Sequence, residues 1–126
     1  MKKFLICSLF CLFSIFSFSQ TLKEVWDEIN KDSIKYPEIV LKQCILETGW
    51  LKSDYCINRH NLFGWNSSNG YMYFDTWQQS VLYYKKWQDK HYKGGDYYQF
   101  LVDIHYAGKD YPTYLKSIKI PSYIYE

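Results

Sequence analysis

The sequence predicts a single α+β domain in which α-helices dominate. Five segments combine a capping residue or a first-turn proline with apolar residues at helical spacing. Two short aromatic runs on either side of an Asn/Ser/Gly cluster predict one β-hairpin, and a chain of 126 residues has room for one domain only. The expected order of elements is therefore helix, helix, hairpin, helix, helix, helix.

The first two helices are predicted in the N-terminal half of the chain. Thr21 and Glu24 have the spacing of a capping box, and the apolar residues that follow recur on one helical face. Pro37 suits the first turn of a second helix, and Gly49 suits the left-handed position just beyond its end. The second helix is therefore predicted over residues 37–48.

A β-hairpin is predicted after an irregular stretch at residues 50–62. The aromatic runs 62–65 and 71–74 would form its strands, and the Asn/Ser/Gly cluster at residues 66–70 would form its turn. A lone two-stranded hairpin is marginally stable in water, so this one is expected to lie against the helices.

Three more helices are predicted in the C-terminal half. Asp75 and Asp96 each precede a glutamine by three residues, which predicts N-caps for helices over residues 77–91 and 97–105. A short last helix is predicted over residues 112–118.

The first 19 residues have the features of a secretory signal peptide. Two lysines precede a short apolar run, and small residues stand at the last and third-last positions. The run is too short to predict a stable membrane anchor. We therefore expect a mature domain over residues 20–126, secreted or periplasmic.

The composition of residues 20–126 excludes several classes of function. Thirteen basic side chains face thirteen acidic ones, so the charge gives no reason to expect binding to nucleic acid or an anionic membrane. No zinc-ligand spacing, phosphate-binding loop or nucleophile elbow occurs, and no metal or cofactor is expected. Aromatic residues are abundant, which suits a small monomeric domain whose rings stack on sugars.

Cys44 and Cys56 are the two cysteines outside the predicted signal peptide. In an oxidising compartment an even number of cysteines favours a disulfide. The alternative is a pair of small, buried, apolar thiols. The sequence favours the disulfide.

Glu47 is the acidic residue that is hardest to explain as a surface charge. It lies in the last turn of the predicted helix 37–48, where the helix dipole disfavours a carboxylate. Its neighbours Leu46, Trp50 and Leu51 are apolar and would desolvate it. Both effects raise the pKa of a carboxyl group, as a general acid requires. The alternative is an exposed glutamate without a catalytic role.

The residues around Glu47 resemble a known family signature. Ile45-Leu46-Glu47-Thr48-Gly49-Trp50, Ser53 and Asn61-Leu62-Phe63-Gly64-Trp65 are similar to the motifs of the bacterial glucosaminidases, glycoside hydrolase family 73. The resemblance covers about residues 36–118. It implies a lysozyme-like fold and activity on peptidoglycan glycan strands.

The resemblance also implies roles for individual residues. Glu47 matches the general acid, and Tyr106 matches a tyrosine of the cleft that is implicated in activity. Asn61, Phe63 and Gly64 match the motif that leads the chain into the hairpin and shapes the cleft floor.

Glycoside hydrolysis usually needs a second carboxylate. No acid occurs in residues 66–74, and Asp75 is the nearest candidate, although it also suits an N-cap. Asp54 is the next candidate. If neither serves, the N-acetyl group of the substrate could act in its place.

Four aromatic residues are candidates for sugar binding. Trp50 follows the acid, while Trp65, Tyr71 and Tyr73 share one parity within the predicted strands and could present their rings on one face. The alternative is that these rings pack against the helices.

The expected function is thus that of an exported endo-β-N-acetylglucosaminidase. It would cleave the β-1,4 bond between N-acetylglucosamine and N-acetylmuramic acid. The alternatives are a lytic transglycosylase or muramidase-like enzyme on the same polymer, and a non-catalytic glycan-binding module.

Overall fold

The computed structural model describes residues 20–126, so the predicted signal peptide lies outside the described residues. The elements are α2 (Leu22–Lys31), α3 (Pro37–Thr48), α4 (Asp54–Arg59), β1 (Asn66–Ser67), β2 (Gly70–Tyr71), α5 (Trp77–His91), α6 (Tyr97–Asp103), α7 (Tyr111–Ser117) and the 3₁₀-helix η1 (Ser122–Tyr125). The predicted α+β class with a majority of helix is confirmed.

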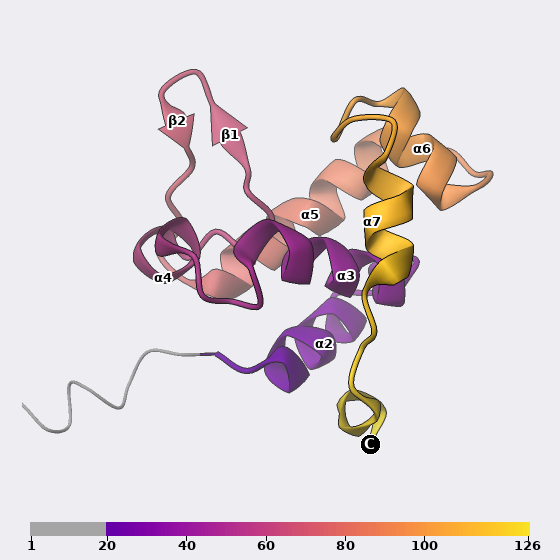
Figure 1. Ribbon diagram of the computed structural model, residues 1–126. Coiled ribbons are helices and arrows are strands. Elements are labelled where there is room, and N and C mark those ends of the chain that lie inside the picture. The colour runs from indigo at the N-terminus through magenta and orange to yellow at the C-terminus, as the bar shows by residue number, and fades with distance from the viewer. Residues whose placement is uncertain (1–19) are drawn as a thin grey trace, which may run out of the picture.

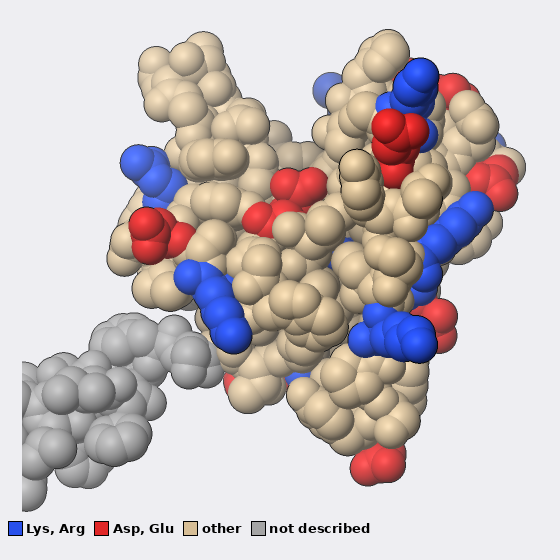
Figure 2. Space-filling model, viewed as in Figure 1, with Lys and Arg blue, Asp and Glu red and all other residues tan. Residues whose placement is uncertain are grey.

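Helix α3 is the central element of the domain. It contacts α2 and α7, and α2 in turn contacts α5 and η1. Figure 1 shows the β-hairpin and α6 as two projections on the same side of the molecule, with α3 passing between their bases. Figure 2 shows that the surface is hollowed between these projections, with acidic side chains at the bottom of the hollow.

Local signals account well for the first two helices. Thr21 and Glu24 form the predicted capping box, in which each side chain accepts a hydrogen bond from the other residue's backbone. Pro37 begins α3, and Gly49 follows its last residue in the left-handed conformation, with φ of 54°. The predicted bounds of α3 are confirmed.

Two local predictions in the middle of the chain are wrong. The stretch expected to be irregular contains α4, whose N-cap Ser53 accepts a hydrogen bond from the Cys56 amide. The N-cap of α5 is Thr76 and not Asp75, because the Thr76 hydroxyl is the group that accepts from the Gln79 amide. Neighbouring Asp and Thr residues can both cap a helix, and the sequence does not decide between them.

The hairpin is shorter than predicted, and all of its residues except Tyr71 fall in the expected turn. Each strand has two residues: Asn66 pairs with Tyr71, and Ser67 pairs with Gly70. The predicted strand 62–65 instead turns into the core, and its first two residues are almost fully buried. Burial of these apolar side chains decides the path of the chain here.

The predicted disulfide is a further correction. Cys44 and Cys56 are free thiols, with exposed fractions of 0% and 1%. Both belong to the apolar core, where each fills the volume of a small hydrophobic side chain. The alternative that the sequence left open is therefore the one observed.

The helices in residues 20–126 do not include one that is both long and apolar enough to cross a membrane.

Candidate active site

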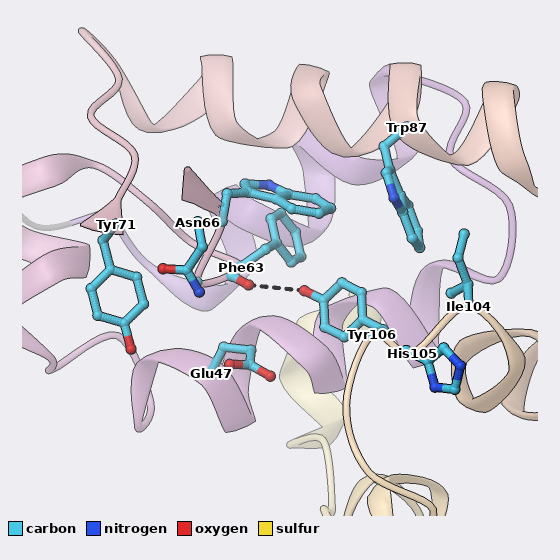
Figure 3. A pocket seen from close by; sticks show the side chains of 10 residues that line it. Glu47, Phe63, Asn66, Tyr71, Trp87, Ile104, His105 and Tyr106 are labelled. Carbon is cyan, nitrogen blue, oxygen red and sulfur yellow. Dashed lines mark hydrogen bonds between the residues drawn. The ribbon is translucent and has the colours of Figure 1, made fainter. Parts of the chain in front are cut away.

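A pocket of about 300 Å³ lies in the hollow between the two projections. Its walls come from the end of α3, the segment before β1, the hairpin, α5 and the segment after α6. The lining residues are Glu47, Phe63, Gly64, Trp65, Asn66, Tyr71, Trp87, Ile104, His105 and Tyr106. Among these residues Glu47 alone carries a carboxyl group, and Figure 3 shows it beneath the rings that form the walls.

Glu47 has a raised pKa, as the sequence predicts. Burial of the carboxyl group is the main cause, and a hydrogen bond from the Tyr111 hydroxyl to Oε1, 3.1 Å long, acts in the opposite direction. The sequence neighbours Leu46 and Trp50 are 38% and 45% exposed, so their apolar side chains do not bury the carboxyl group in the way expected. Residues distant in sequence bury it instead.

Gly64 is one of these distant residues. Its φ of +66° favours glycine, and a Cβ atom added there would lie 3.1 Å from Oε2 of Glu47. A side chain at Gly64 would therefore crowd the carboxyl group, so the glycine leaves the space that Glu47 occupies.

Asn61 builds the turn that carries Gly64. Its buried side chain donates to the carbonyl oxygens of Trp65 and Met72, over 2.8 and 3.0 Å, and accepts from the Trp65 amide over 2.9 Å. These bonds join the turn to the base of the hairpin. Asn61 thus supports the turn beside the pocket without lining the pocket.

Tyr106 also supports this turn. Its hydroxyl donates to the Phe63 carbonyl oxygen over 2.9 Å, and its ring stacks on Tyr111 at a centroid distance of 5.6 Å. Figure 3 shows the hydroxyl directed at the backbone of Phe63, above Glu47. The hydroxyl is therefore engaged with the protein, while the ring forms part of the wall.

A second pair of stacked tyrosines lies on the hairpin side of Glu47. The rings of Tyr55 and Tyr71 are 4.5 Å apart and nearly parallel. Burial raises the pKa of Tyr55 to about 12, and the nearby charge of Glu47 contributes to this increase. Glu47 therefore lies between two tyrosine pairs, one from α4 and β2 and the other from the segment after α6 and from α7.

The structure brings together six of the predicted site residues and separates the other four. Glu47, Phe63, Gly64, Trp65, Tyr71 and Tyr106 line the pocket, whereas Trp50, Asn61, Tyr73 and Asp75 do not. The prediction that three hairpin rings share one face is wrong. Trp65 packs inward against Tyr84 and Trp87, while Tyr73 is 61% exposed and outside the pocket. The strands are too short to impose an alternating pattern on these rings.

Several residues of the site were missed by the sequence analysis. Tyr55 and Tyr111 reach Glu47 from α4 and α7, and Trp87 and His105 complete the walls. The sequence contains no local signal for them, because they meet only in the folded chain. Within residues 20–126, the titratable side chains form no cluster suited to a metal ion.

A partly buried carboxyl group of raised pKa, at the floor of an aromatic pocket, is the arrangement of a glycoside hydrolase. The model of the family named Glucosaminidase, described as mannosyl-glycoprotein endo-beta-N-acetylglucosaminidase, matches residues 23–122. The chain belongs to this family. Membership of the family indicates a glycosidase of the peptidoglycan type. No curated protein and no solved structure gives a significant match to the chain.

Proposed function

We propose that the protein is an exported endo-β-N-acetylglucosaminidase that cleaves peptidoglycan. Its substrate bond is the β-1,4 bond between N-acetylglucosamine and N-acetylmuramic acid. The predicted signal peptide at residues 1–19 supports export, and the family supports the polymer. The observation that carries the proposal is the carboxyl group of Glu47, which burial keeps protonated at higher pH than an exposed glutamate.

The proposed first step is protonation of the glycosidic oxygen by Glu47. The bond between the anomeric carbon and this oxygen then breaks, and the bonding electron pair stays on the leaving oxygen. The pocket suits this step because several of its lining residues are aromatic and burial partly desolvates the carboxyl group.

The lining residues favour a mechanism in which the substrate itself supplies the second catalytic group. Glu47 is the only acid among them, and Asp75 lies outside the pocket. The acetamido oxygen of the sugar would bond to the anomeric carbon and form a cationic oxazolinium ring. Water would then open this ring and return a proton to Glu47. Asp75 is therefore no part of the proposed mechanism.

The same single acid also suits a lytic transglycosylase. In that reaction the 6-hydroxyl of N-acetylmuramic acid replaces water, so the product has a 1,6-anhydro end. The two activities differ in which β-1,4 bond breaks, because the 6-hydroxyl attacks the anomeric carbon of its own N-acetylmuramic acid, and therefore in their products.

Mass spectrometry of digested peptidoglycan separates the alternatives. We expect purified sacculi treated with residues 20–126 to release fragments with N-acetylglucosamine at the reducing end. Reducing N-acetylmuramic acid would indicate a muramidase, and 1,6-anhydro ends would indicate a transglycosylase. Binding to sacculi without any cleavage would support the non-catalytic module and contradict the proposal.

Tyr71 and Tyr73 provide a matched pair of variants for sugar binding. Tyr71→Ala is expected to raise KM for soluble wall fragments roughly fivefold, because a stacked ring contributes about 1 kcal/mol to binding. Tyr73→Ala should leave KM unchanged, since its ring is outside the pocket. Initial rates at several substrate concentrations measure both. Equal effects of the two substitutions would show that Tyr71 has no special role.

A further inference from the structure

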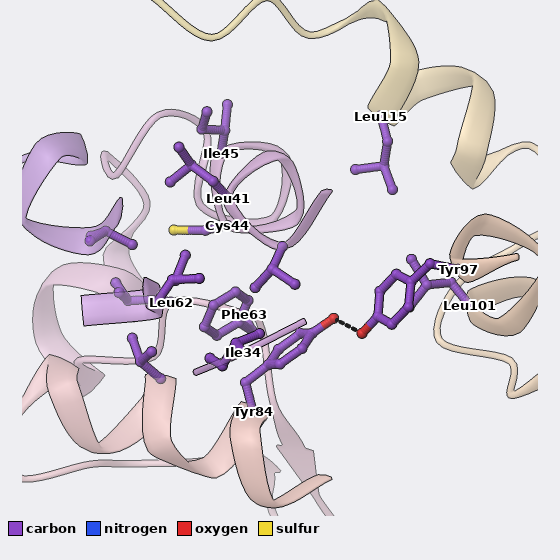
Figure 4. Close-up of a cluster of buried hydrophobic side chains, with 14 of the residues drawn as sticks. Ile34, Leu41, Cys44, Ile45, Leu62, Phe63, Tyr84, Tyr97, Leu101 and Leu115 are labelled. Atoms are coloured by element: carbon purple, nitrogen blue, oxygen red, sulfur yellow. Dashed lines mark hydrogen bonds between the residues drawn. The ribbon is translucent and has the colours of Figure 1, made fainter. Parts of the chain in front are cut away.

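A row of buried polar side chains runs through the core toward Glu47. At its far end the Gln88 amide exchanges two hydrogen bonds with the Lys35 backbone and donates to the Tyr97 hydroxyl over 2.9 Å. The hydroxyls of Tyr97 and Tyr84 are 2.6 Å apart, and Tyr84 donates to Oε1 of Gln43 over 2.5 Å. Figure 4 shows the Tyr84–Tyr97 bond among the surrounding apolar side chains.

Gln43 connects this row to the site. It lies one helical turn before Glu47 on α3 and is fully buried. Its Nε2 atom has no partner with hydrogen-bond geometry among the described residues, yet the Gln43 side chain lies close enough to Tyr111 to lower the pKa of that hydroxyl. The Gln43 oxygen already accepts from the Tyr84 hydroxyl, so the amide nitrogen is the group that remains for Tyr111, although no hydrogen bond joins the two in the described residues.

The hydrogen-bond chemistry fixes the direction of donation along the row. An amide oxygen can only accept, so Tyr84 must donate to Gln43 and must therefore accept from Tyr97. Tyr97 in turn accepts from the Gln88 amide. Every donor thus points toward Tyr111, whose own hydroxyl donates to Oε1 of Glu47.

We propose that this row is a positioning device for the acid: it presents a donor to Oε1 of Glu47 and so confines the transferable proton to Oε2. We call the five residues Gln88, Tyr97, Tyr84, Gln43 and Tyr111 the donor row. Oε2 is the oxygen beside Gly64, in the wall of the pocket. The inference rests on the proposed role of Glu47, and it makes Tyr111 and Gln43 positioning residues for that role.

Other titratable groups also surround the Glu47 carboxyl. Tyr55, Tyr106 and Cys44 face it from α4, from the segment after α6 and from α3, and burial raises the pKa of each. They therefore stay neutral while Glu47 titrates. His105 lines the same pocket, so its ring resonances must be followed in parallel.

Carboxyl NMR titration of residues 20–126 with ¹³C-labelled glutamate tests the proposal without any substrate. A donor to the carboxylate lowers its pKa, so Tyr111→Phe should raise the pKa of Glu47 by about one unit. Tyr84 is not itself a lining residue, and Tyr84→Phe keeps the ring that packs behind Phe63, Trp65 and Trp87. This variant should raise the pKa of Glu47 in the same direction by roughly half as much, because Gln43 is no longer held. Tyr123→Phe is the control, since this exposed ring lies in η1.

The proposal is overturned if the pKa of Glu47 in Tyr111→Phe equals that of the wild type. It is also overturned if Tyr84→Phe shifts the pKa no more than Tyr123→Phe does. Gln43→Met keeps the side-chain volume and removes the amide, and it replaces Tyr84→Phe if that variant does not fold. If the shifts appear but the protein cleaves no peptidoglycan, the donor row stands and the proposed activity fails.

Discussion

Replacement of Glu47 by glutamine is expected to reduce the rate of peptidoglycan cleavage by about 10²–10⁴-fold. The amide has the shape of the acid but no proton that it can transfer to the glycosidic oxygen. Its oxygen can still accept from the Tyr111 hydroxyl, so the fold and the pocket should be retained. Release of reducing ends from sacculi measures the rate, and circular dichroism checks the fold.

Glu38→Gln is the matched control for this experiment. Glu38 lies in the first turn of the same helix and is exposed, so the chemical change is identical but remote from the pocket. This variant should cleave peptidoglycan at the wild-type rate. If Glu47→Gln is as active as Glu38→Gln, the assignment of the general acid is wrong.

Gly64→Ala is expected to have the second-largest effect. The added methyl group would lie 3.1 Å from Oε2 of Glu47, which is a tight contact. The carboxyl group must therefore move by a few tenths of an ångström, and because misplacement of a catalytic group by about 1 Å can cost roughly 10²-fold, we expect a loss of up to about tenfold in rate. The left-handed backbone should also lower the free energy of unfolding by about 1–2 kcal/mol.

Gly49→Ala separates the effect of contact with the carboxyl group from the effect of backbone strain. Gly49 has a similar φ of +54°, and a Cβ atom there would have no neighbour within 4 Å. Both variants should lose comparable stability in urea unfolding, but Gly64→Ala alone should lose most of its activity. Equal activities would mean that contact with the carboxyl group is unimportant.

The family resemblance predicted an acid at Glu47 and part of its surroundings. Glu47, Gly64 and Tyr106 were expected at the site, and the structure places all three in one pocket. The hydroxyl of Tyr106 donates to the Phe63 carbonyl oxygen, and its role in activity stays a prediction. The sequence neighbours of Glu47 correctly predicted that its pKa is raised. They did not predict the cause, which is burial by distant parts of the chain.

The sequence by itself determined the helices whose ends depend on nearby residues. Thr21 with Glu24, Pro37 with Gly49, and Asp96 act within one helical turn, so no distant contact is needed to recognise them. The same locality explains why adjacent candidates for the cap of α5 could not be distinguished.

Only the tertiary structure decided what surrounds the acid. Tyr111 donates to Glu47 from 64 positions along the chain, and Tyr55 meets Tyr71 across the pocket wall. The burial of both cysteines as free thiols likewise depends on the packed core. Such contacts form because distant segments bury apolar surface against one another. The residues that meet in this way are not marked by a periodic pattern in the sequence around them.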